Sequence, residues 1–320
     1  MSIPMTPAGP SSGTPALEPV AGPDAERGVS LWRGAFQRMR RNPSAIIGTL
    51  IMLLFVLVAV FAPLLTSFEP GTGEFFREVT PSKVPGPSEQ HWLGLDSGGS
   101  DMWTQLVYGA RQSLIYGVAS TVVGLLAGSL LGVLAGGFGS VGGRVGRWVD
   151  TVIMRIVDIL LSIPSLLLAV SIAAVITQDS LAIIIAIGAA QVPIFARLLR
   201  SSMLAQGGAD YVLAGNALGF RKRRIVMSHI LPNSVGPTIV QATLNLATAI
   251  IEVAALSYLG LGADNPRVAE WGRMLVNAQE RFSADPRLAI LPGVCIVISA
   301  LGFTLFGEAL REALDPRSRR

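Results

Sequence analysis

Six apolar segments occupy much of the chain, and their length limits the folds that are available to it. Segments 45–65 and 113–138 contain no charged residue, and about 20 apolar residues in an α-helix cross the roughly 30 Å hydrocarbon core of a bilayer. The other four segments are 159–177, 181–196, 234–251 and 288–307. Transmembrane β-strands alternate in polarity and run only about 10 residues, which these segments do not match. The sequence therefore predicts an all-α polytopic membrane protein with six transmembrane helices.

The composition agrees with membrane insertion and argues against other classes of protein. Charged residues make up 14% of the 320 residues, against about 25% in a typical soluble domain. The single cysteine, Cys295, excludes a disulfide within the chain, and neither His91 nor His229 has a cysteine beside it. Clusters of His and Cys are the usual ligands of structural metal sites. We therefore expect no catalytic, cofactor-binding or metal-binding residues.

The distribution of basic residues predicts the orientation in the membrane. With the N-terminus inside, the inner segments hold 17 Lys and Arg residues and the outer segments hold 7. Cytoplasmic loops are enriched in these residues, so both termini are predicted to be cytoplasmic. The same enrichment explains the net charge of +4 without binding of nucleic acid.

The chain divides into segments of different character. Residues 1–29 are rich in Pro, Ala, Gly and Ser, and such a composition cannot bury enough apolar surface to fold. The expected order is a disordered cytoplasmic tail at 1–29, an interfacial amphipathic helix at 30–44, a first transmembrane helix at 45–66, an extracytoplasmic loop at 67–110, a core domain with five transmembrane helices at 111–310 that includes a cytoplasmic loop at 201–233, and a cytoplasmic tail at 311–320. Within the outer part, EWGRMLVNAQERF at 270–282 predicts an amphipathic helix at the outer surface.

A row of glycines in the second apolar segment predicts close helix packing. The row comprises Gly124, Gly128, Gly132 and Gly136, each four residues after the last. Small residues on one helix face allow two backbones to approach closely in lipid, where apolar burial no longer drives association. The alternative is that the bare row lets a neighbouring helix slide along it during a conformational cycle.

Three ionisable residues at membrane depth are candidate gating or path residues. Arg155 and Asp158 are three residues apart and could pair on one helix face, either as a structural pair or as a gating element. Pro164, just beyond them, is expected to kink the helix. Glu252 lies late in the fifth segment and should face the interior of the bundle or a water-filled cavity, in a structural, gating or substrate-binding role.

Residues 211–233, YVLAGNALGFRKRRIVMSHILPN, interrupt the apolar pattern. Apolar residues recur at helical spacing on both sides of Gly219, which breaks the run, and Pro232 is expected to end the second helix. The segment thus predicts a helix, a turn and a second helix that project into the cytoplasm. An ordinary charged loop that anchors the topology is the simpler alternative.

The spacing in this segment resembles the coupling loop of ABC importer permeases, E-A-A-x3-G-x9-I-x-L-P. Ala214, Gly219 and the pair Leu231-Pro232 match this pattern, whereas Leu213, Gly215 and His229 stand where Glu, Ala and Ile are usual. Other motifs resemble the dipeptide and oligopeptide branch, of the DppC/OppC type. They are RRNPSAIIG at 40–48, HWLGLD at 91–96, YGARQSL at 108–114, LSYLGLG at 256–262 and EWGRML at 270–275. Leu95, Ser100 and Gln105 depart from that branch, which has Thr at the first position and Arg at the other two.

The resemblance, over about residues 30 to 315, implies a type I ABC importer permease fold (MetI-like) in the bacterial inner membrane. It implies a second permease subunit of the DppB/OppB type, two ABC ATPase domains and an extracytoplasmic substrate-binding protein as partners. The chain lacks the G-x-x-x-x-G-K-[ST] motif, so ATP and Mg would be bound by the ATPase partners. The coupling loop would comprise Ala214, Gly215, Leu218, Gly219, Arg221, Lys222, Arg223, Arg224, His229, Leu231 and Pro232.

The implied function is import of di- or oligopeptides, with the chain forming half of the translocation path. The same scaffold could instead import nickel chelates, opines or glutathione. A passive channel or membrane scaffold would not need a coupling loop. A membrane-embedded enzyme would need a cluster of nucleophilic or metal-binding residues that the sequence lacks.

Overall fold

All regular structure in the described part of the chain is helical, as the sequence predicts. The computed structural model describes residues 31–80, 83–141, 143–176, 179–265 and 267–314. The expected tail at 1–29 lies outside the described residues, and so do residues 315–320 of the expected C-terminal tail.

The helices follow one another with few long connections. The α-helices are α1 (Leu31–Met39), α2 (Pro43–Val60), α3 (Ala62–Leu65), α4 (Met102–Val141), α5 (Gly143–Leu161), α6 (Ser165–Ala173), α7 (Ser180–Gly207), α8 (Asp210–Ala217), α9 (Lys222–Ile225), α10 (Leu231–Leu256), α11 (Trp271–Ala278) and α12 (Arg287–Leu314). The short 3-10 helices are η1 (Phe76–Glu78) and η4 (Gln279–Arg281), and the π-helical turns are η2 (Val226–Ile230) and η3 (Ser257–Leu261).

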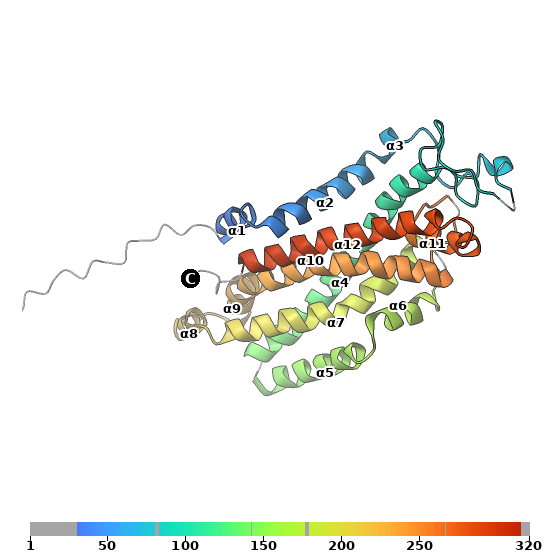
Figure 1. Ribbon diagram of the computed structural model, residues 1–320. Helices are drawn as coiled ribbons and strands as arrows, with labels where there is room; N and C mark the ends of the chain where they lie inside the picture. The colour runs from blue at the N-terminus through green and yellow to red at the C-terminus, as the bar shows by residue number, and fades with distance from the viewer. Residues whose placement is uncertain (1–30, 81–82, 142, 177–178, 266, 315–320) are drawn as a thin grey trace, which may run out of the picture.

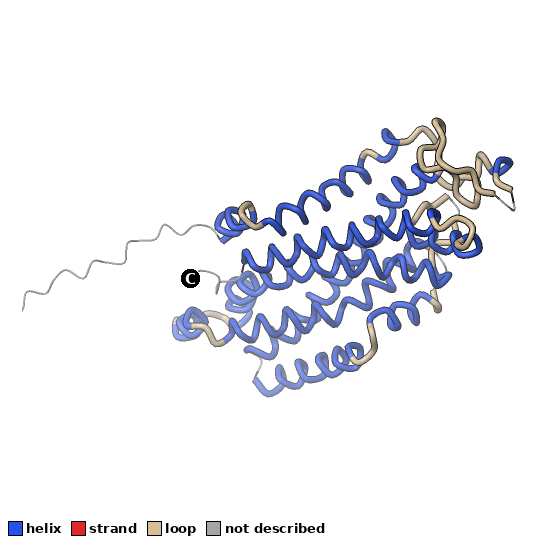
Figure 2. The backbone as a smooth tube through the Cα atoms, in the orientation of Figure 1, coloured by secondary structure: helices blue, strands red, loops and turns tan. Residues whose placement is uncertain are grey.

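The long helices form one elongated bundle. Helix α4 packs along α7, α10 packs against α4, α7 and α12, and α2 lies on α12 at one edge (Figure 1). Helices α8 and α9 lie at one end of the bundle, and α11 lies at the other end with the loop that connects α3 to α4. Loops and short helices gather at these two ends (Figure 2).

Five helices are long and apolar enough to cross a membrane, and a broken sixth span is added if α5 and α6 are counted together. These two helices meet at an angle of 91°. Pro164 is the last residue of the break, directly before α6. Its ring has no N–H and disfavours helical geometry in the residue before it. The kink expected at Pro164 is thus a full break between two half-helices.

Pro232 does not end a helix, contrary to the sequence prediction. The helical path is continuous from Lys222 to Leu259, directly before the left-handed Gly260, and it passes through η2 directly before Leu231. The amide of Leu231 donates to the Val226 carbonyl, five residues back. The helix therefore continues past Pro232, and the wider π-helical turn lies where this proline interrupts the regular α-helical bonding.

Several helices extend beyond the apolar segments that predicted them. Helix α4 begins at Met102, inside the expected outer loop 67–110, and α7 continues to Gly207, inside the expected cytoplasmic loop 201–233. Helix α12 continues to Leu314, inside the expected tail. Apolar runs mark the part of a helix that lies in lipid, so a helix that continues into the aqueous phase is underestimated by hydropathy.

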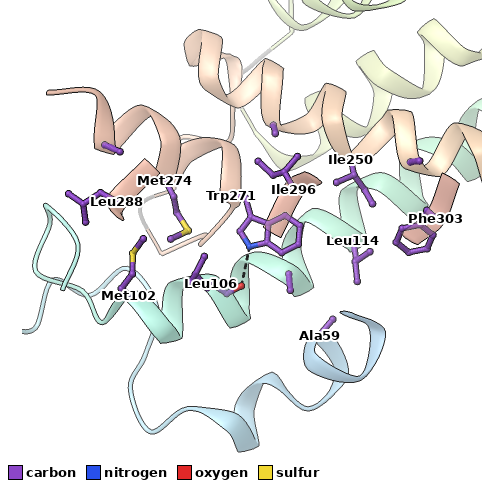
Figure 3. Close-up of a cluster of buried hydrophobic side chains, with 14 residues drawn as sticks. Ala59, Met102, Leu106, Leu114, Ile250, Trp271, Met274, Leu288, Ile296 and Phe303 are labelled. Carbon is purple, nitrogen blue, oxygen red and sulfur yellow. Dashed lines mark hydrogen bonds between the residues drawn. The ribbon is translucent and has the colours of Figure 1, made fainter. Parts of the chain in front are cut away.

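The expected amphipathic helix near the outer end is α11, but it is packed into the bundle. Trp271, Met274 and Ala278 lie on one face and join a buried cluster with residues of α4, α10 and α12 (Figure 3). The indole Nε1 of Trp271 donates to the Leu106 carbonyl at 3.1 Å. This face of α11 is therefore covered by protein, and only the opposite, polar face of the helix is open to the surroundings.

Candidate functional site

A compact hairpin projects from the end of the bundle that lies opposite α11 (Figure 1). It comprises residues 208–230, which contain α8, α9 and η2. Val212, Ile225, Val226 and Ile230 are buried against Leu199 and Met203 of α7. These contacts hold the hairpin firmly to the bundle, so that a force applied to it is transmitted to α7 and α10.

Gly219 forms the turn of the hairpin. Its φ of 74° lies in the left-handed region, where residues with a Cβ are disfavoured. The Phe220 amide donates to the Gly215 carbonyl, and the Gly219 amide donates to the Asn216 carbonyl, both at 3.0 Å. This is the Schellman arrangement that ends many helices at a glycine. The reason for glycine is backbone conformation, because a Cβ at this position would meet no atom within 4 Å.

The outer surface of the hairpin combines apolar and basic side chains. Leu213, Leu218 and Met227 are exposed, and the Leu218 side chain is 73% exposed. The four basic residues of the turn, Arg221, Lys222, Arg223 and Arg224, are also exposed. Exposed apolar side chains with a charged rim are typical of a protein interaction site.

His229, which stands where the coupling pattern has Ile, packs against its neighbours. Its ring is stacked on that of Phe220, with the centroids 6.2 Å apart. The Arg224 guanidinium lies over the Phe220 ring, 5.1 Å from its centroid. Ala214, Leu231 and Pro232 complete the expected set: Ala214 and Pro232 are exposed, and Leu231 packs against the buried residues of the hairpin. All the predicted coupling residues therefore lie in or beside one hairpin.

The glycine row of α4 faces α7 along its length. Cβ atoms built at Gly124 and Gly128 would lie 2.8 Å from the Gly188 carbonyl oxygen and 2.5 Å from that of Val192. Cβ atoms at Gly132 and Gly136 would lie 2.9 and 3.0 Å from α7 atoms. The space is filled by the backbone of α7, which fits the packing interpretation of the row.

The two predicted ionisable residues of α5 do not pair with each other. Asp158 forms an ion pair with Arg197 of α7, while Arg155 is exposed and makes no ion pair with Asp158. A second bridge joins the same helices: Nε and Nη2 of Arg200 donate to the two carboxylate oxygens of Asp150 at 2.5 and 2.7 Å. The proposed pair within α5 is wrong, because the carboxylates reach across to another helix.

Glu252 lies inside the bundle, as expected of an ionisable residue in the membrane, and is 5% exposed. Ser165, the first residue of α6, donates from Oγ to Glu252 Oε1 at 2.7 Å. The other carboxylate oxygen, Oε2, is buried and has no hydrogen-bond partner among the described residues. Glu252 thus ties α10 to the second half of the broken span, directly after the break.

The sequence did not single out Arg197 and Arg200 of α7. They are three residues apart near the end of an apolar segment, where snorkelling arginines are common. Their spacing places them on one helix face. The signal was present, but the partners came from a helix that is distant in sequence.

Comparison with known proteins decides the family. A model of the family described as "Binding-protein-dependent transport system inner membrane component" matches residues 128–320. The chain belongs to this family. Residues 30–78 match the N-terminal TM domain of oligopeptide transport permease C.

Several members of known type are similar over nearly their whole length. The dipeptide transport system permease protein DppC of Alkalihalophilus pseudofirmus is 43% identical, with 92% of this chain and 93% of the relative covered. The oligopeptide transport system permease protein OppC of Bacillus subtilis is 36% identical over the same shares. The glutathione transport system permease protein GsiD of Salmonella typhimurium is 37% identical, with 93% and 94% covered.

A solved structure supports the fold. An inward-facing conformation of the MetNI methionine ABC transporter superposes with a TM-score of 0.54 at 22% identity, covering 67% of this chain and 97% of the other. The family match and this likeness together confirm the predicted MetI-like permease fold. The chain is a multi-pass membrane permease component.

Proposed function

We propose that this chain is a permease subunit of an ATP-driven importer of di- or oligopeptides and forms half of the translocation path. The observation that carries the proposal is the hairpin at residues 208–230, a rigid projection with an exposed apolar surface, in a chain of this family. The 43% identity to a dipeptide permease and the 36% identity to an oligopeptide permease support the peptide as substrate.

The proposed complex has three kinds of partner besides the lipid bilayer. A second permease subunit of the DppB/OppB type completes the path, two ABC ATPase domains bind ATP and Mg, and an extracytoplasmic binding protein delivers the substrate. This chain binds no cofactor, and it has no nucleotide site of its own. The complex lies in a bacterial inner membrane with both termini of this chain in the cytoplasm and α1 at the inner interface.

The hairpin is the proposed contact with one ATPase. Leu213 and Leu218 would enter a cleft of the ATPase, and the basic residues Arg221 to Arg224 would meet acidic groups around it. When ATP closes the ATPase dimer, the hairpin is displaced, and the bundle changes the side from which the path is open. Coupling of this kind requires the two ATPase states to bind the hairpin in different positions.

Two further parts of the bundle take part in the proposed cycle. Glu252 and Ser165 hold the broken span closed on α10, and Arg155 and Asp158 lie on the same span nearer the cytoplasm. The glycine row of α4 keeps α7 in close contact, so that the two helices move as one unit.

Replacement of Gly219 tests the coupling role. Gly219→Val places a β-branched residue at a φ of 74° and should reduce peptide uptake by at least about tenfold in proteoliposomes, while the chain still inserts and assembles. Gly219→Asn should retain most uptake, because Asn tolerates this conformation. Gly208→Val is the matched control: Gly208 lies in the same hairpin with a φ of −92° and open space around it. Normal uptake by Gly219→Val would contradict the coupling assignment.

Glutathione is a second candidate substrate, because a glutathione permease is 37% identical over 93% of this chain. Mass spectrometry of the ligand that copurifies with the binding protein of the complex distinguishes the two. Recovery of peptides without a γ-glutamyl linkage supports the first proposal, and recovery of glutathione supports the second.

A further inference from the structure

A pocket of about 190 Å³ opens near the outer end of the bundle, between α4, η3 and α11. Its volume is many times the roughly 10–15 Å³ that one water molecule requires. The residues that line it with polar groups are Tyr116, Ser257, Asp264, Glu270, Arg273 and Asn277. The pocket lies at the end of the molecule opposite the hairpin, where a substrate would arrive from outside.

Helix α11 supplies one wall of the pocket with the face that is not packed in the core. Glu270, Arg273 and Asn277 recur at helical spacing on this face, whereas Trp271 and Met274 lie on the buried one. The packing of Trp271, which is fully buried, fixes the orientation of the helix. The polar face is therefore held in place before any ligand binds.

The wall of the pocket is acidic. Asp264 and Glu270 supply two carboxyl groups against the single guanidinium of Arg273. Burial raises the pKa of Glu270, although Ser257 and the Gly272 and Arg273 amides lower it, so a nearby cation would stabilise its charged form. Nη1 of Arg273 already donates to the carbonyls of Ala263 and Asn265 at 2.8 and 2.6 Å, which fixes the loop after η3. The remaining imbalance favours a cation over an anion in the pocket.

Two polar groups that line the pocket, Glu270 and Ser257, are buried. Glu270 is 3% exposed, and its Oε1 accepts the Gly272 amide at 2.9 Å as the N-cap of α11. Ser257 is 4% exposed; its Oγ makes no hydrogen bond of ordinary geometry among the described residues, but it lies beside the Glu270 carboxyl group and lowers the pKa of that group. A buried carboxylate and a buried hydroxyl are costly unless something pairs with them. A ligand ammonium group, with three donors, could satisfy both kinds of acceptor.

We propose that this pocket receives the ammonium end of a short peptide at the outer mouth of the permease, with the Glu270 carboxylate as its principal partner. The inference rests on the proposed function and adds a site on this chain for one end of the substrate. Asp264 contributes a second, more exposed negative charge, and the hydroxyls of Tyr116 and Ser257 accept further hydrogen bonds.

Peptide binding to the permease–ATPase complex in nanodiscs, without the binding protein, tests the site directly. Labelled alanyl-alanine should bind saturably, and N-acetyl-alanyl-alanine, which has no ammonium group, should fail to compete. Glu270→Gln keeps the oxygen that caps α11 and removes the charge, and we expect it to weaken binding roughly tenfold, as for the loss of a charged hydrogen-bond partner. Glu280→Gln, an exposed change on the same outer segment, should bind as the unmodified chain does.

A second variant tests the site in case the Glu270→Gln complex fails to assemble. Asp264 is exposed, so Asp264→Asn should weaken peptide binding only about twofold to fivefold and should not affect assembly. The proposal is overturned if the unmodified complex shows no saturable binding, if the acetylated peptide competes equally, or if neither variant binds more weakly than Glu280→Gln. Uptake by the complete complex with its binding protein separates the two failures: uptake of peptide without binding here overturns this site alone, whereas no uptake of any peptide overturns the proposed function.

Discussion

Arg200 of α7 forms a bidentate ion pair with Asp150 of α5, through hydrogen bonds of 2.5 and 2.7 Å. The Arg200 side chain is 27% exposed and the Asp150 side chain 11% exposed. The neighbouring pair between Arg197 and Asp158 has side chains that are about half exposed. Two ion pairs thus join α5 to α7, and the Asp150–Arg200 pair is less exposed to solvent than the Asp158–Arg197 pair.

The two bridges should differ in strength. A double-mutant cycle with Asp150→Asn and Arg200→Gln should give a coupling free energy of about 1–2 kcal/mol, less than for a fully buried pair because water reaches Arg200. The same cycle on Asp158 and Arg197 should give about 0–1 kcal/mol. Thermal or denaturant unfolding of the purified complex measures both cycles, and a larger coupling for the exposed pair would contradict this ranking.

Asp96, in the loop between α3 and α4, lies near Ser100 and Gln105, which stand where the resembled branch is expected to have arginines. Its carboxylate accepts the amides of Gly98 and Ser100 at 2.9 and 2.7 Å and contacts the Gln105 side chain only at 3.4 Å. Burial raises the pKa of Asp96 despite these hydrogen bonds, which lower it. The loop should therefore lose stability as the pH rises through this pKa.

Gln105→Arg should reverse this dependence. A guanidinium next to Asp96 lowers its pKa, and the loop should gain about 1–2 kcal/mol at neutral pH. The gain should disappear as the pH falls through the lowered pKa, because the protonated carboxyl no longer pairs with the arginine. Hydrogen exchange of amides 91–101 as a function of pH measures the effect. Gln279→Arg, which adds the same charge at an exposed outer position, should leave this exchange unchanged.

Gly128 of α4 should tolerate no side chain. A Cβ there would lie 2.5 Å from the Val192 carbonyl oxygen and 2.6 Å from the Phe195 Cβ, so Gly128→Ala should cost about 1–3 kcal/mol through separation of α4 from α7. Gly293→Ala in α12 is the control, because a Cβ there meets nothing within 4 Å. That change should be neutral or slightly stabilising. The unfolding temperatures of the two variants measure this difference. Equal values would show that the glycine row does not determine how closely α4 packs against α7.

Ser165→Ala should disturb the broken span without unfolding it. The change leaves Glu252 without its donor from α6, and we expect peptide uptake to fall several-fold while the amount of assembled complex stays the same. Ser171→Ala is on the same helix but removes only a bond to the Leu167 carbonyl within that helix. Uptake assays of both variants in proteoliposomes compare the two. If Ser171→Ala were as harmful as Ser165→Ala, the bond to α10 would have no special part in transport.

The spans and the hairpin were predictable from sequence because both depend on local patterns. Uncharged runs identify helices in lipid. Gly219 identifies a turn, because glycine adopts the left-handed backbone conformation of such a turn without strain. The wrong expectations concern where one helix ends and which residues form ion pairs. Pro232 is expected to end a helix, but the π-helical turn η2 directly before it lets the helical path continue into α10.

The partners of charged residues were not predictable from the same patterns. Spacing on one helix suggested that Arg155 pairs with Asp158, yet both carboxylates of α5 bind arginines of α7. The burial of Trp271 was missed for a similar reason. Its helix has an apolar face, and sequence periodicity does not state whether lipid or protein covers such a face.

The helical path from Lys222 to Leu259 has a consequence for the distance over which this permease acts. At 1.5 Å per residue it forms a rod of roughly 57 Å. The rod begins in the turn of the hairpin and ends directly before Gly260, which lines the pocket next to α11. A tilt of about 5° at its base would displace its far end by roughly 5 Å. In the proposed complex, nucleotide turnover at the hairpin would thus reshape the proposed peptide site at the other end of the bundle through the inclination of a single helix.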